Sequence, residues 1–368
     1  VEQMRAEGIP ALFLNSSLSR EDYSANMACV RCGRAKLLYV APETLLTPHI
    51  LDLLSQVKPD CLAIDEAHCI SEWGHDFRPE YRQLADMRRR WPKAVCLALT
   101  ATATPRVRSD ISSSLGFRAS DEFVASFNRE NLFIEVAPKR DGAVQLSRFL
   151  EGFREQSGIV YCFSRRQVDE LSTYLARRGY AVRPYHAGLD DRTRSRNQED
   201  FVRDDVQIMV ATIAFGMGIN KPNVRFVVHY DLPKSIEGYY QEIGRAGRDG
   251  LSAHCLLLYS YGDVAKLRYF IDQKEGEEQK AAAQQLDAVV RYAEDRRTCR
   301  RKPLLAYFGE QFPAEQCGNC DNCTAESPVL EDITIPSQKF LSCVFRTGER
   351  FGAGYVADVL LGLSLIHI

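Results

Sequence analysis

The sequence predicts an α/β protein built from two parallel-sheet lobes in tandem, followed by a small helical region that carries cysteines. Short apolar segments alternate with helical stretches through the first lobe, and the alternation starts again in the second. Strands and crossover helices at this spacing are typical of parallel sheets covered on both faces. The 368 residues are also too many for one ordinary core. We therefore expect domains at 1–125, 126–272, 273–327 and 328–368.

The composition limits the functional class. A net charge of −2 excludes a uniformly basic nucleic-acid binder, so any affinity for DNA must come from local patches. Twelve cysteines without a signal peptide indicate a reducing compartment in which most thiols are buried. No apolar run approaches the length of a membrane span, so we expect a soluble cytosolic chain with no membrane partner.

Both ends of the sequence indicate a chain cut from a longer one. Val1 is not an initiator residue, and the first residues are expected to lie in the middle of a helix. Leu360–Ile368 is almost entirely apolar, with no turn or cap after it. This tail is either a truncated element or foreign sequence.

Strand and helix signals can be placed along both lobes. Thr104 comes directly before Pro105, which is the usual order of an N-cap and the first residue of a helix. The first lobe is predicted to hold strands at 11–14, 36–40, 61–64 and 95–99, and helices at 80–90 and 105–115. The second is predicted to hold strands at 132–136, 158–162, 181–185, 206–211, 224–229 and 253–259. Two such lobes in tandem suggest a ligand cleft between them.

Two adjacent carboxylates, Asp65 and Glu66, follow the strand predicted at 61–64, which we expect to be buried. The carboxyl end of such a strand is where α/β sheets place ligand chemistry. One carboxylate can hold Mg²⁺ through its water shell, and the second can orient or deprotonate an attacking water molecule. An Asp-Glu pair by itself is usually a solvated acidic turn, but here the residues that follow favour a functional role.

The run at 71–79 mixes aromatic, basic and loop-forming residues. Trp73 and Phe77 offer faces on which bases can stack, and His75 and Arg78 can meet phosphates. A segment of apolar core would not interleave charges in this way. Because the loop leaves the strand end that carries the carboxylates, a shift of the loop can reach both of them.

Three polar residues near the end of the second lobe have helical spacing. Gln241, Arg245 and Arg248 lie at i, i+4 and i+7, so they share one face if the segment is helical. Gly244 and Gly247 would let that helix lie close to another surface. Two guanidiniums on one face suit a γ-phosphate held by the opposite lobe. Arginines at this spacing are usually solvated charges, but the two glycines argue against that interpretation.

Four cysteines in the third region match a closed tetrahedral zinc site: Cys299, Cys317, Cys320 and Cys323. An iron–sulfur cluster also uses four cysteines and is the alternative occupant. The basic run 300–302 could be held toward DNA by this metal site. Cys29 and Cys32 form a lone C-x-x-C pair, which we interpret as incidental thiols.

A phosphate-binding loop of the G-x-x-x-x-G-K-[ST] type is absent from the sequence, and Gly-Lys never occurs. A Mg²⁺-binding carboxylate pair needs phosphates beside it, and these need the lysine and backbone cradle of such a loop. The chain is therefore expected to hydrolyse little ATP by itself. If the loop lies before Val1, a βα unit of at least ~30 residues is missing.

Asp65–His68 followed by Cys69–Tyr81 resembles motif II and the aromatic-rich loop of the RecQ family of superfamily 2 DNA helicases. The cysteine pattern from Cys299 to Cys323 resembles the zinc-binding subdomain of that family, which is not general to helicases. Arg350–Tyr355 resembles the entry to its winged-helix domain. The resemblance implies two RecA-like lobes, the first truncated, then a small helical zinc-binding subdomain and the start of a winged helix.

The resemblance also implies an activity. The family couples ATP hydrolysis to 3′-to-5′ movement on single-stranded DNA, and so separates duplex strands in DNA repair and recombination. ATP, Mg²⁺ and Zn²⁺ are the implied cofactors. Single-stranded and forked DNA are the implied partners, with a single-strand-binding protein as a further candidate. The implied location is the bacterial cytoplasm, at the nucleoid.

Site residues follow from the resemblance motif by motif. The implied catalytic residues, of which the first two hold Mg²⁺, are Asp65, Glu66, His68, Gln241, Arg245 and Arg248. The implied nucleotide contacts are Gly218, Asn220, Arg245 and Arg248. The residues implied to bind DNA, or to couple it to the nucleotide, are Trp73, His75, Phe77, Arg78, Thr100, Thr102, Ser164, Arg165, His186, Thr212, Phe215, Gly216, Met217 and Gly218.

Some of these assignments have plainer alternatives. Ser164, Arg165 and His186 fit ordinary strand-to-helix turns as well as DNA-facing motifs. Asn15–Ser17 and Tyr39–Glu43 are either phosphate contacts or helix caps. A second hypothesis for the whole chain is a non-hydrolysing DNA-binding or scaffold protein. The carboxylate pair and the arginines of the second lobe argue against it, because a scaffold needs neither.

Overall fold

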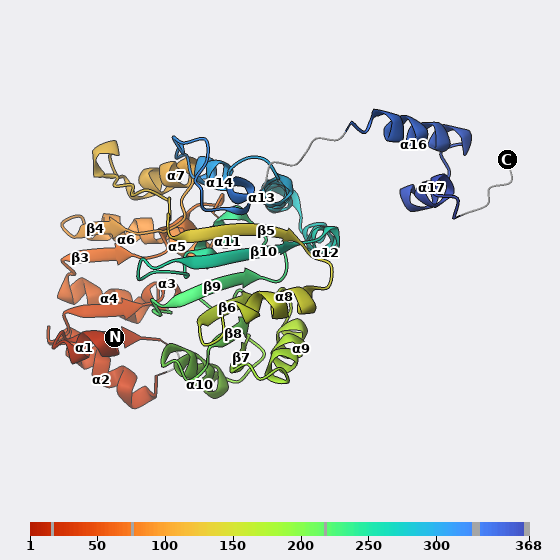
Figure 1. Ribbon diagram of the computed structural model, residues 1–368. Coiled ribbons are helices and arrows are strands. Elements are labelled where there is room, and N and C mark those ends of the chain that lie inside the picture. Colours follow the sequence, from red (N-terminus) through yellow and green to blue (C-terminus); the bar gives the residue numbers. More distant parts are fainter. Residues whose placement is uncertain (16–17, 75–76, 217–218, 326–331, 364–368) are drawn as a thin grey trace. The chain divides into compact units, whose positions relative to one another are not determined.

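The computed structural model describes residues 1–15, 18–74, 77–216, 219–325 and 332–363 (Figure 1). They belong to two compact units, Val1–Thr324 and Ala325–Ile368, each with its own internal packing. Parallel strands alternate with helices through the first unit, which confirms the predicted fold class.

The described part of the first lobe contains four short strands that pair as two parallel ladders. β1 (Ala11–Leu14) pairs with β2 (Leu37–Val40), and β3 (Cys61–Ile64) pairs with β4 (Val95–Ala98). All four strands lie where the sequence predicts them. Among the described residues, the two ladders are separate two-stranded sheets rather than one continuous sheet.

Helices connect and follow these strands along the chain. The Thr104 side chain accepts a hydrogen bond from the Val107 amide, so the predicted N-cap is confirmed.

The single helix predicted at 80–90 is wrong. The Gln83 amide bonds to the Glu80 carbonyl, three residues back, and this tight turn divides the segment. The helices are α1 (Glu2–Ala6), α2 (Arg20–Arg31), α3 (Pro42–Leu45), α4 (Pro48–Val57), α5 (Pro79–Arg82), α6 (Leu84–Arg90) and α7 (Pro105–Leu115), with a 3-10 turn η1 (Ala67–Ile70).

The prediction that the strand before Asp65 is buried on both faces is wrong. Ile64 is 3% exposed, but Cys61 and Ala63 are exposed, and in β4 Val95 is 60% exposed. Successive residues of a strand point to opposite faces, so this alternation means that helices cover one face of β3 and β4 and leave the other uncovered. The apolar run is therefore half-buried, although its composition is that of a buried strand.

The second lobe is a six-stranded parallel sheet in the order β5-β10-β9-β6-β8-β7. Every predicted strand of this lobe is confirmed, with shifts of up to two residues at the ends. The strands are β5 (Leu132–Pro138), β6 (Ser157–Tyr161), β7 (Val182–Tyr185), β8 (Ile208–Ala211), β9 (Val224–His229) and β10 (Ala253–Tyr259). The helices of the lobe are α8 (Gly142–Glu151), α9 (Arg165–Ala176), α10 (Asp191–Val202), α11 (Ile236–Ile243) and α12 (Tyr261–Ile271), and η2 (Ala119–Asp121) precedes it.

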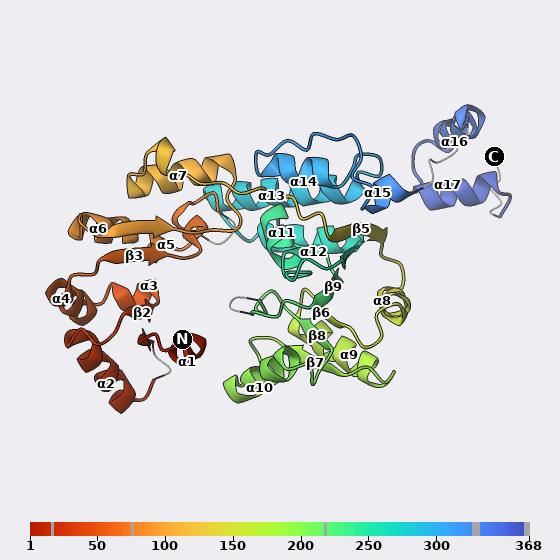
Figure 2. The ribbon, with the colours of Figure 1, turned by 60° about the vertical axis from the view of Figure 1, so that its left-hand side comes forward.

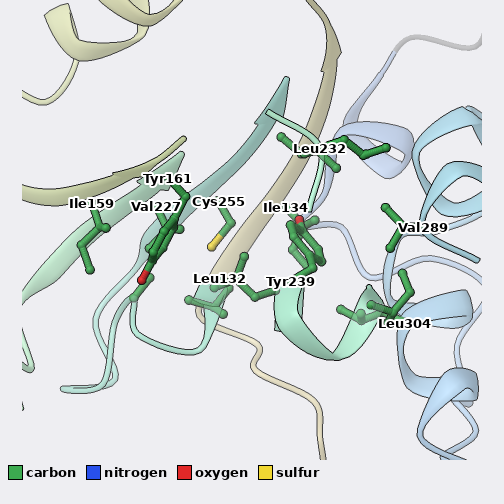
Figure 3. Packing of buried hydrophobic residues seen from close by; sticks show 14 of the residues in the cluster. Leu132, Ile134, Ile159, Tyr161, Val227, Leu232, Tyr239, Cys255, Val289 and Leu304 are labelled. Carbon is green, nitrogen blue, oxygen red and sulfur yellow. The ribbon is translucent and has the colours of Figure 1, made fainter. Parts of the chain in front are cut away.

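The cysteine-bearing region shares a hydrophobic core with one face of this sheet. Its helices are α13 (Gly276–Glu294), α14 (Arg301–Tyr307) and α15 (Asp321–Thr324). Figure 3 shows Val289 and Leu304 of α13 and α14 facing Ile134 of β5 and Tyr239 of α11. Figure 2 shows the same helices from another side, running along β5 and α11. The cysteine-bearing region is therefore built onto the second lobe, because the two bury one apolar cluster together.

The described part of the second unit holds two helices that pack on each other, α16 (Thr334–Arg346) and α17 (Ala353–Leu360). Phe351 and Tyr355 stack with ring centroids 4.5 Å apart. Residues 364–368, which make up most of the apolar tail, lie outside the described residues. In the described part of the chain, no helix combines the length and apolar character that crossing a membrane requires.

Candidate nucleotide site and zinc centre

The carboxylate pair sits on a constrained turn at the end of β3. Glu66 has left-handed backbone angles, φ 50° and ψ 43°, which cost a residue with a side chain about 1–3 kcal/mol. The Glu66 amide donates to Asp65 Oδ1 over 2.9 Å, and the Ala67 amide donates to the Leu99 carbonyl over 2.9 Å. The turn is thus tied to the end of β4, and both carboxylates leave the sheet at its carboxyl edge.

His68 connects this turn with the threonines that follow β4. Its ring is 2% exposed, and Nδ1 lies 3.1 Å from Thr100 Oγ1 and 3.3 Å from Glu66 Oε2. Thr100 Oγ1 also accepts a hydrogen bond from the Thr102 amide over 3.3 Å. Thr102 is 1% exposed, and its hydroxyl has no partner among the described residues. A partly buried chain of polar contacts therefore runs from Glu66 to Thr102.

The loop after the carboxylates is held by α7. Ser71 Oγ donates to Asp110 Oδ2 over 2.6 Å and accepts from the Trp73 amide over 3.2 Å. The Arg106 guanidinium lies over the indole of Trp73, 3.2 Å from its centroid, and Trp73 is half-buried against the core. Arg106 covers one face of the Trp73 ring, which leaves the other face for a base, so stacking of bases on Trp73 stays a prediction.

The rest of this loop is described only in part. His75 lies outside the described residues. Phe77 is half-buried, with the Arg82 guanidinium 5.8 Å from its ring centroid. The Arg78 amide donates to the Cys69 carbonyl over 3.1 Å, which returns the loop to η1. A Cβ at Gly74 would clash with the His68 carbonyl, so glycine is needed there.

The single helical face predicted for Gln241, Arg245 and Arg248 is wrong. α11 ends at Ile243, and both arginines lie in the turns that follow. Gly247 has φ 55°, and its amide bonds to the Val224 carbonyl over 2.9 Å, which a continuing helix would not allow. The chain therefore folds back onto β9 at the point where a regular helix would carry the arginines away.

The structure nevertheless brings these residues to one cavity of about 400 Å³. Gln241 Nε2 lies 3.5 Å from Glu66 Oε1, across the space between the lobes. Among the described residues, three arginines line the cavity and Glu66 is the only lining acid, a charge balance that suits a polyanion. The lining residues are Glu66, Ala101, Arg129, Gly216, Ile219, Asn220, Tyr240, Gln241, Gly244, Arg245 and Arg248.

The guanidiniums at this cavity are bonded to carbonyls of their own lobe. Arg245 is 8% exposed and donates to the Gly216 carbonyl. Arg248 donates to the carbonyls of Ile219 over 3.0 Å and Gly244 over 3.3 Å. Partial burial, together with the charge of Arg245, lowers the pKa of the Arg248 guanidinium. A bound phosphate would relieve this crowding of positive charge by exchanging with the carbonyls.

The sequence did not indicate that a further arginine, Arg129, lines the cavity. Arg129 precedes β5, and its guanidinium donates to the carbonyls of Ala246 over 3.0 Å and Gly247 over 2.8 Å. Tyr240 also lines the cavity, and its hydroxyl donates to the Phe127 carbonyl over 2.8 Å. No local pattern distinguishes Arg129, because its partners lie more than a hundred residues further along the chain.

Residues 212–220 were predicted to contact both DNA and nucleotide. Of those that the structure describes, some are buried in the lobe and others line the cavity. The ring of Phe215 is 1% exposed and packs on Tyr185, with centroids 4.7 Å apart, so the predicted contact of this side chain with DNA is wrong. Gly216 lines the cavity, where a Cβ would clash with the Arg245 guanidinium. Thr212 is half-buried, and Asn220 is exposed at the cavity. Met217 and Gly218 lie outside the described residues.

Other residues predicted to face DNA have local structural partners. Ser164 caps α9 by accepting from the Gln167 amide over 3.2 Å, and Arg165 is the exposed first residue of that helix. His186 is 5% exposed, with Nε2 3.0 Å from Asp169 Oδ1 and Nδ1 accepting from the Gly188 amide over 3.1 Å. The imidazole is therefore satisfied on both nitrogens, whereas Ser164 and Arg165 remain accessible at the carboxyl edge of the sheet.

Two further segments of the first lobe were predicted to be either phosphate contacts or helix caps. Asn15 follows β1, and Ser16 and Ser17 lie outside the described residues. Tyr39 is 48% exposed near the end of β2, and α3 begins at Pro42 without a side-chain cap.

The four predicted zinc ligands meet in space. The sulfur atoms of Cys299, Cys317, Cys320 and Cys323 all lie within 4.8 Å of one another. Burial raises the pKa of the Cys299 and Cys320 thiols, whereas backbone hydrogen bonds at Cys317 and the neighbouring thiols lower the pKa of Cys323. Backbone amides also donate to Cys320 over 3.5 Å and to Cys317 over 3.4 Å. Such donors stabilise thiolates, so the residues fit a structural zinc ion.

The basic run beside Cys299 does not face DNA as predicted. Arg300 is 1% exposed and Arg301 is 3% exposed. Arg300 forms a bidentate pair with Asp321, with both contacts at 2.8 Å, and Arg301 donates to Cys317 Sγ over 3.0 Å. Of the three basic residues, only Lys302 is partly exposed, paired with an exposed glutamate. Arg300 and Arg301 are therefore buried and hold the segments that carry the cysteine cluster.

Four known protein families match the chain in sequence. Residues 2–111 match the DEAD/DEAH box helicase family, and 143–250 match the helicase conserved C-terminal domain. Residues 261–324 match the RecQ zinc-binding family, and 327–365 match the RQC domain. The first two matches fall on the two lobes that share the cavity. Fold, cavity and matches together define a chain of the helicase class.

Similar proteins narrow this class. "ATP-dependent DNA helicase RecQ" of Pasteurella multocida is 46% identical over 99% of this chain and 57% of its own length. The proteins of the same name from Haemophilus influenzae and Bacillus subtilis are 45% and 41% identical. The chain belongs to the RecQ family of helicases. It spans 57% to 61% of the length of these curated relatives.

Solved structures share the fold at low sequence identity. Yeast Dbp5 bound to RNA and ADP BeF3 is 19% identical, with a TM-score of 0.56 over 76% of this chain and 74% of Dbp5. The helicase Lhr of Mycobacterium smegmatis, bound to single-stranded DNA and AMP-PNP, is 19% identical. Its TM-score is 0.53 over 76% of this chain and 39% of Lhr. Both share the two-lobe architecture of this chain.

Proposed function

We propose that this chain forms the motor of an ATP-dependent DNA helicase that moves 3′-to-5′ on single-stranded DNA and separates duplex strands. The observation that carries the proposal is the cavity in which Glu66 of the first lobe meets Gln241, Arg245 and Arg248 of the second. A site divided between two lobes lets nucleotide binding and release change how the lobes meet. The relatives named ATP-dependent DNA helicase RecQ support the substrate.

Within this site the residues divide the work of hydrolysis. Asp65 and Glu66 would hold Mg²⁺, which neutralises phosphate charge when bound. Glu66 orients the attacking water and takes its proton, and His68 keeps Glu66 in register with Thr100. Arg245 and Arg248 stabilise the charge on the transferred phosphoryl group once they leave their carbonyl partners. A phosphate-binding loop, absent from residues 1–368, is needed to complete the site.

Further parts of the proposal concern partners and place. Forked and single-stranded DNA would follow the accessible residues Ser164 and Arg165 and the loop around Trp73. A single-strand-binding protein is a proposed partner, and DNA repair and recombination at the nucleoid of the bacterial cytoplasm is the proposed setting. We also propose domain boundaries at 125/126, 272/273 and 327/328, with a winged helix starting in the last part.

Polarity tests the proposed movement directly. A chain that joins residues 1–368 to a phosphate-binding loop should unwind a duplex with a 3′ single-stranded tail and leave a 5′-tailed duplex intact. The measurement is strand release from fluorescently labelled partial duplexes in the presence of ATP and Mg²⁺. Blunt duplex is the control for tail-independent melting. Release from the 5′-tailed substrate alone would contradict the proposed polarity.

Replacing Trp73 by alanine tests whether its loop couples DNA to hydrolysis. Trp73 lies under Arg106 of α7, and its amide bonds to Ser71, so the ring holds the loop that returns to the carboxylate turn. In the chain with a phosphate-binding loop, we expect the maximal DNA-stimulated ATPase rate to fall more than DNA affinity does. The measurement is ATPase rate against single-stranded DNA concentration, with Trp73→Phe as the variant that keeps an aromatic ring. An unchanged plateau with a shifted midpoint would reduce the loop to a grip on DNA.

A further inference from the structure

A buried arginine connects the cysteine cluster to the start of the six-stranded sheet. Arg301 Nη1 donates to Cys317 Sγ over 3.0 Å. Its Nη2 donates to the carbonyls of Arg129 over 3.0 Å and Leu132 over 2.7 Å, and Nε donates to Asn128 Oδ1 over 3.1 Å. One planar guanidinium, 3% exposed, thus fixes residues 128–132 against a metal ligand.

A second arginine continues from that segment to the cavity. The Arg129 carbonyl is held by Arg301, and the Arg129 guanidinium donates to the carbonyls of Ala246 and Gly247 over 3.0 and 2.8 Å. Asn131 Nδ2 adds a bond to the Gly247 carbonyl over 2.8 Å. These carbonyls belong to the turn that carries Arg245 and Arg248, which we call the arginine turn (residues 244–248).

We infer that Arg301 and Arg129 act as positioning residues through which the cysteine cluster holds the arginine turn at the cavity. A guanidinium distributes rigid donors over several acceptors, so displacing one acceptor strains the bonds to the others. Displacing the Cys317 sulfur from this position would leave the buried charge of Arg301 short of an acceptor and loosen residues 128–132. Because the Arg129 guanidinium bonds to the carbonyls of Ala246 and Gly247, the arginine turn would then become less ordered as well. The inference rests on the proposed function only where it treats the cavity as a nucleotide site.

Two buried arginines that differ in their partners allow a matched test. Arg301→Lys keeps the charge but loses the fork that reaches residues 128–132. Arg300→Lys makes the same change one residue earlier, where the guanidinium is 1% exposed and bonds to Asp321 and to the Tyr292 carbonyl. Asp321 also accepts a hydrogen bond from the Val136 amide of β5, so the Arg300 contacts reach the sheet but not residues 128–132 or the arginine turn.

The readout is amide hydrogen exchange in the zinc-loaded 368-residue chain. We expect Arg301→Lys to raise exchange at the amides of Ala246 and Gly247 roughly tenfold or more, since local opening follows the loss of charge-assisted hydrogen bonds. Arg300→Lys should leave these two amides unchanged. The Cys255 amide in the middle of β10 is the reference for global unfolding. Equal exchange at Ala246 and Gly247 in the two variants would overturn the inference.

A second measurement keeps the test decisive if Arg301→Lys does not fold. Removing zinc from the wild-type chain with a chelator should raise exchange at Ala246 and Gly247. The same treatment of Arg129→Lys, which leaves the cysteine cluster untouched, should add little to exchange that is already raised. If zinc removal raised exchange in Arg129→Lys as much as it does in the wild-type chain, the coupling would not pass through Arg129, and the inference would be overturned. Neither measurement needs ATP, so failure of the proposed nucleotide site would be seen separately.

Discussion

Replacing Cys320 and Cys323 together by serine should abolish zinc binding and unfold the region from Cys299 to Cys323. Structural zinc contributes on the order of 10 kcal/mol to folding in small metal-bound domains. Cys320 is fully buried and pairs with Ile134 of β5, so its sulfur is a ligand inside the core shared with the second lobe. We expect the wild-type chain to carry about one zinc ion, and the double variant to carry none and to melt at a clearly lower temperature.

A second C-x-x-C pair in the same chain supplies the control. Cys29 is half-buried and Cys32 is exposed, and neither belongs to the cysteine cluster. The double substitution Cys29→Ser and Cys32→Ser should leave the zinc content and the melting temperature almost unchanged. Metal analysis of the purified proteins and thermal unfolding followed by circular dichroism measure both effects. If zinc remained bound after the loss of Cys320 and Cys323, the ligand assignment would be wrong.

Glu66→Gln should lower ATP hydrolysis roughly 100- to 10,000-fold, the range that a positioned general base contributes. The assay requires residues 1–368 joined to a phosphate-binding loop, and the 368-residue chain alone should hydrolyse negligible ATP because it lacks that loop. The amide keeps the size of the side chain and its place beside His68 and Gln241, but it cannot take a proton. Nucleotide binding should therefore fall far less than the rate of hydrolysis.

A nearby carboxylate separates this effect from a general loss of charge. Glu72 lies in the loop that follows and pairs on the surface with Arg82, at 56% side-chain exposure. Glu72→Gln should leave hydrolysis nearly unchanged, because exposed pairs contribute little. DNA-stimulated ATPase rates of the two variants provide the comparison. Robust hydrolysis by Glu66→Gln, or by the 368-residue chain alone, would contradict the proposed roles.

Local sequence determined the strands and the chemistry at their ends. The strand 61–64 and the carboxylates after it were predictable because an apolar run bounded by charges has few alternatives in an α/β chain. The zinc ligands were predictable for a similar reason, since cysteine spacing restricts which sulfurs can share one ion. Thr104 as an N-cap follows from two neighbouring residues, Thr104 and Pro105.

Tertiary structure decided which partners each charge has. The sequence suggests that Arg301 is a surface cation beside a cysteine, but its acceptors lie on residues about 170 positions earlier, and it is buried. Arg129 shows no local pattern and becomes a cavity residue only when the arginine turn folds back on it. That turn itself departs from helical periodicity because the Gly247 amide bonds to β9. Sequence spacing determines which side chains can act together locally, whereas the hydrogen bonds that use them join segments whose proximity is set only by the packing of the whole fold.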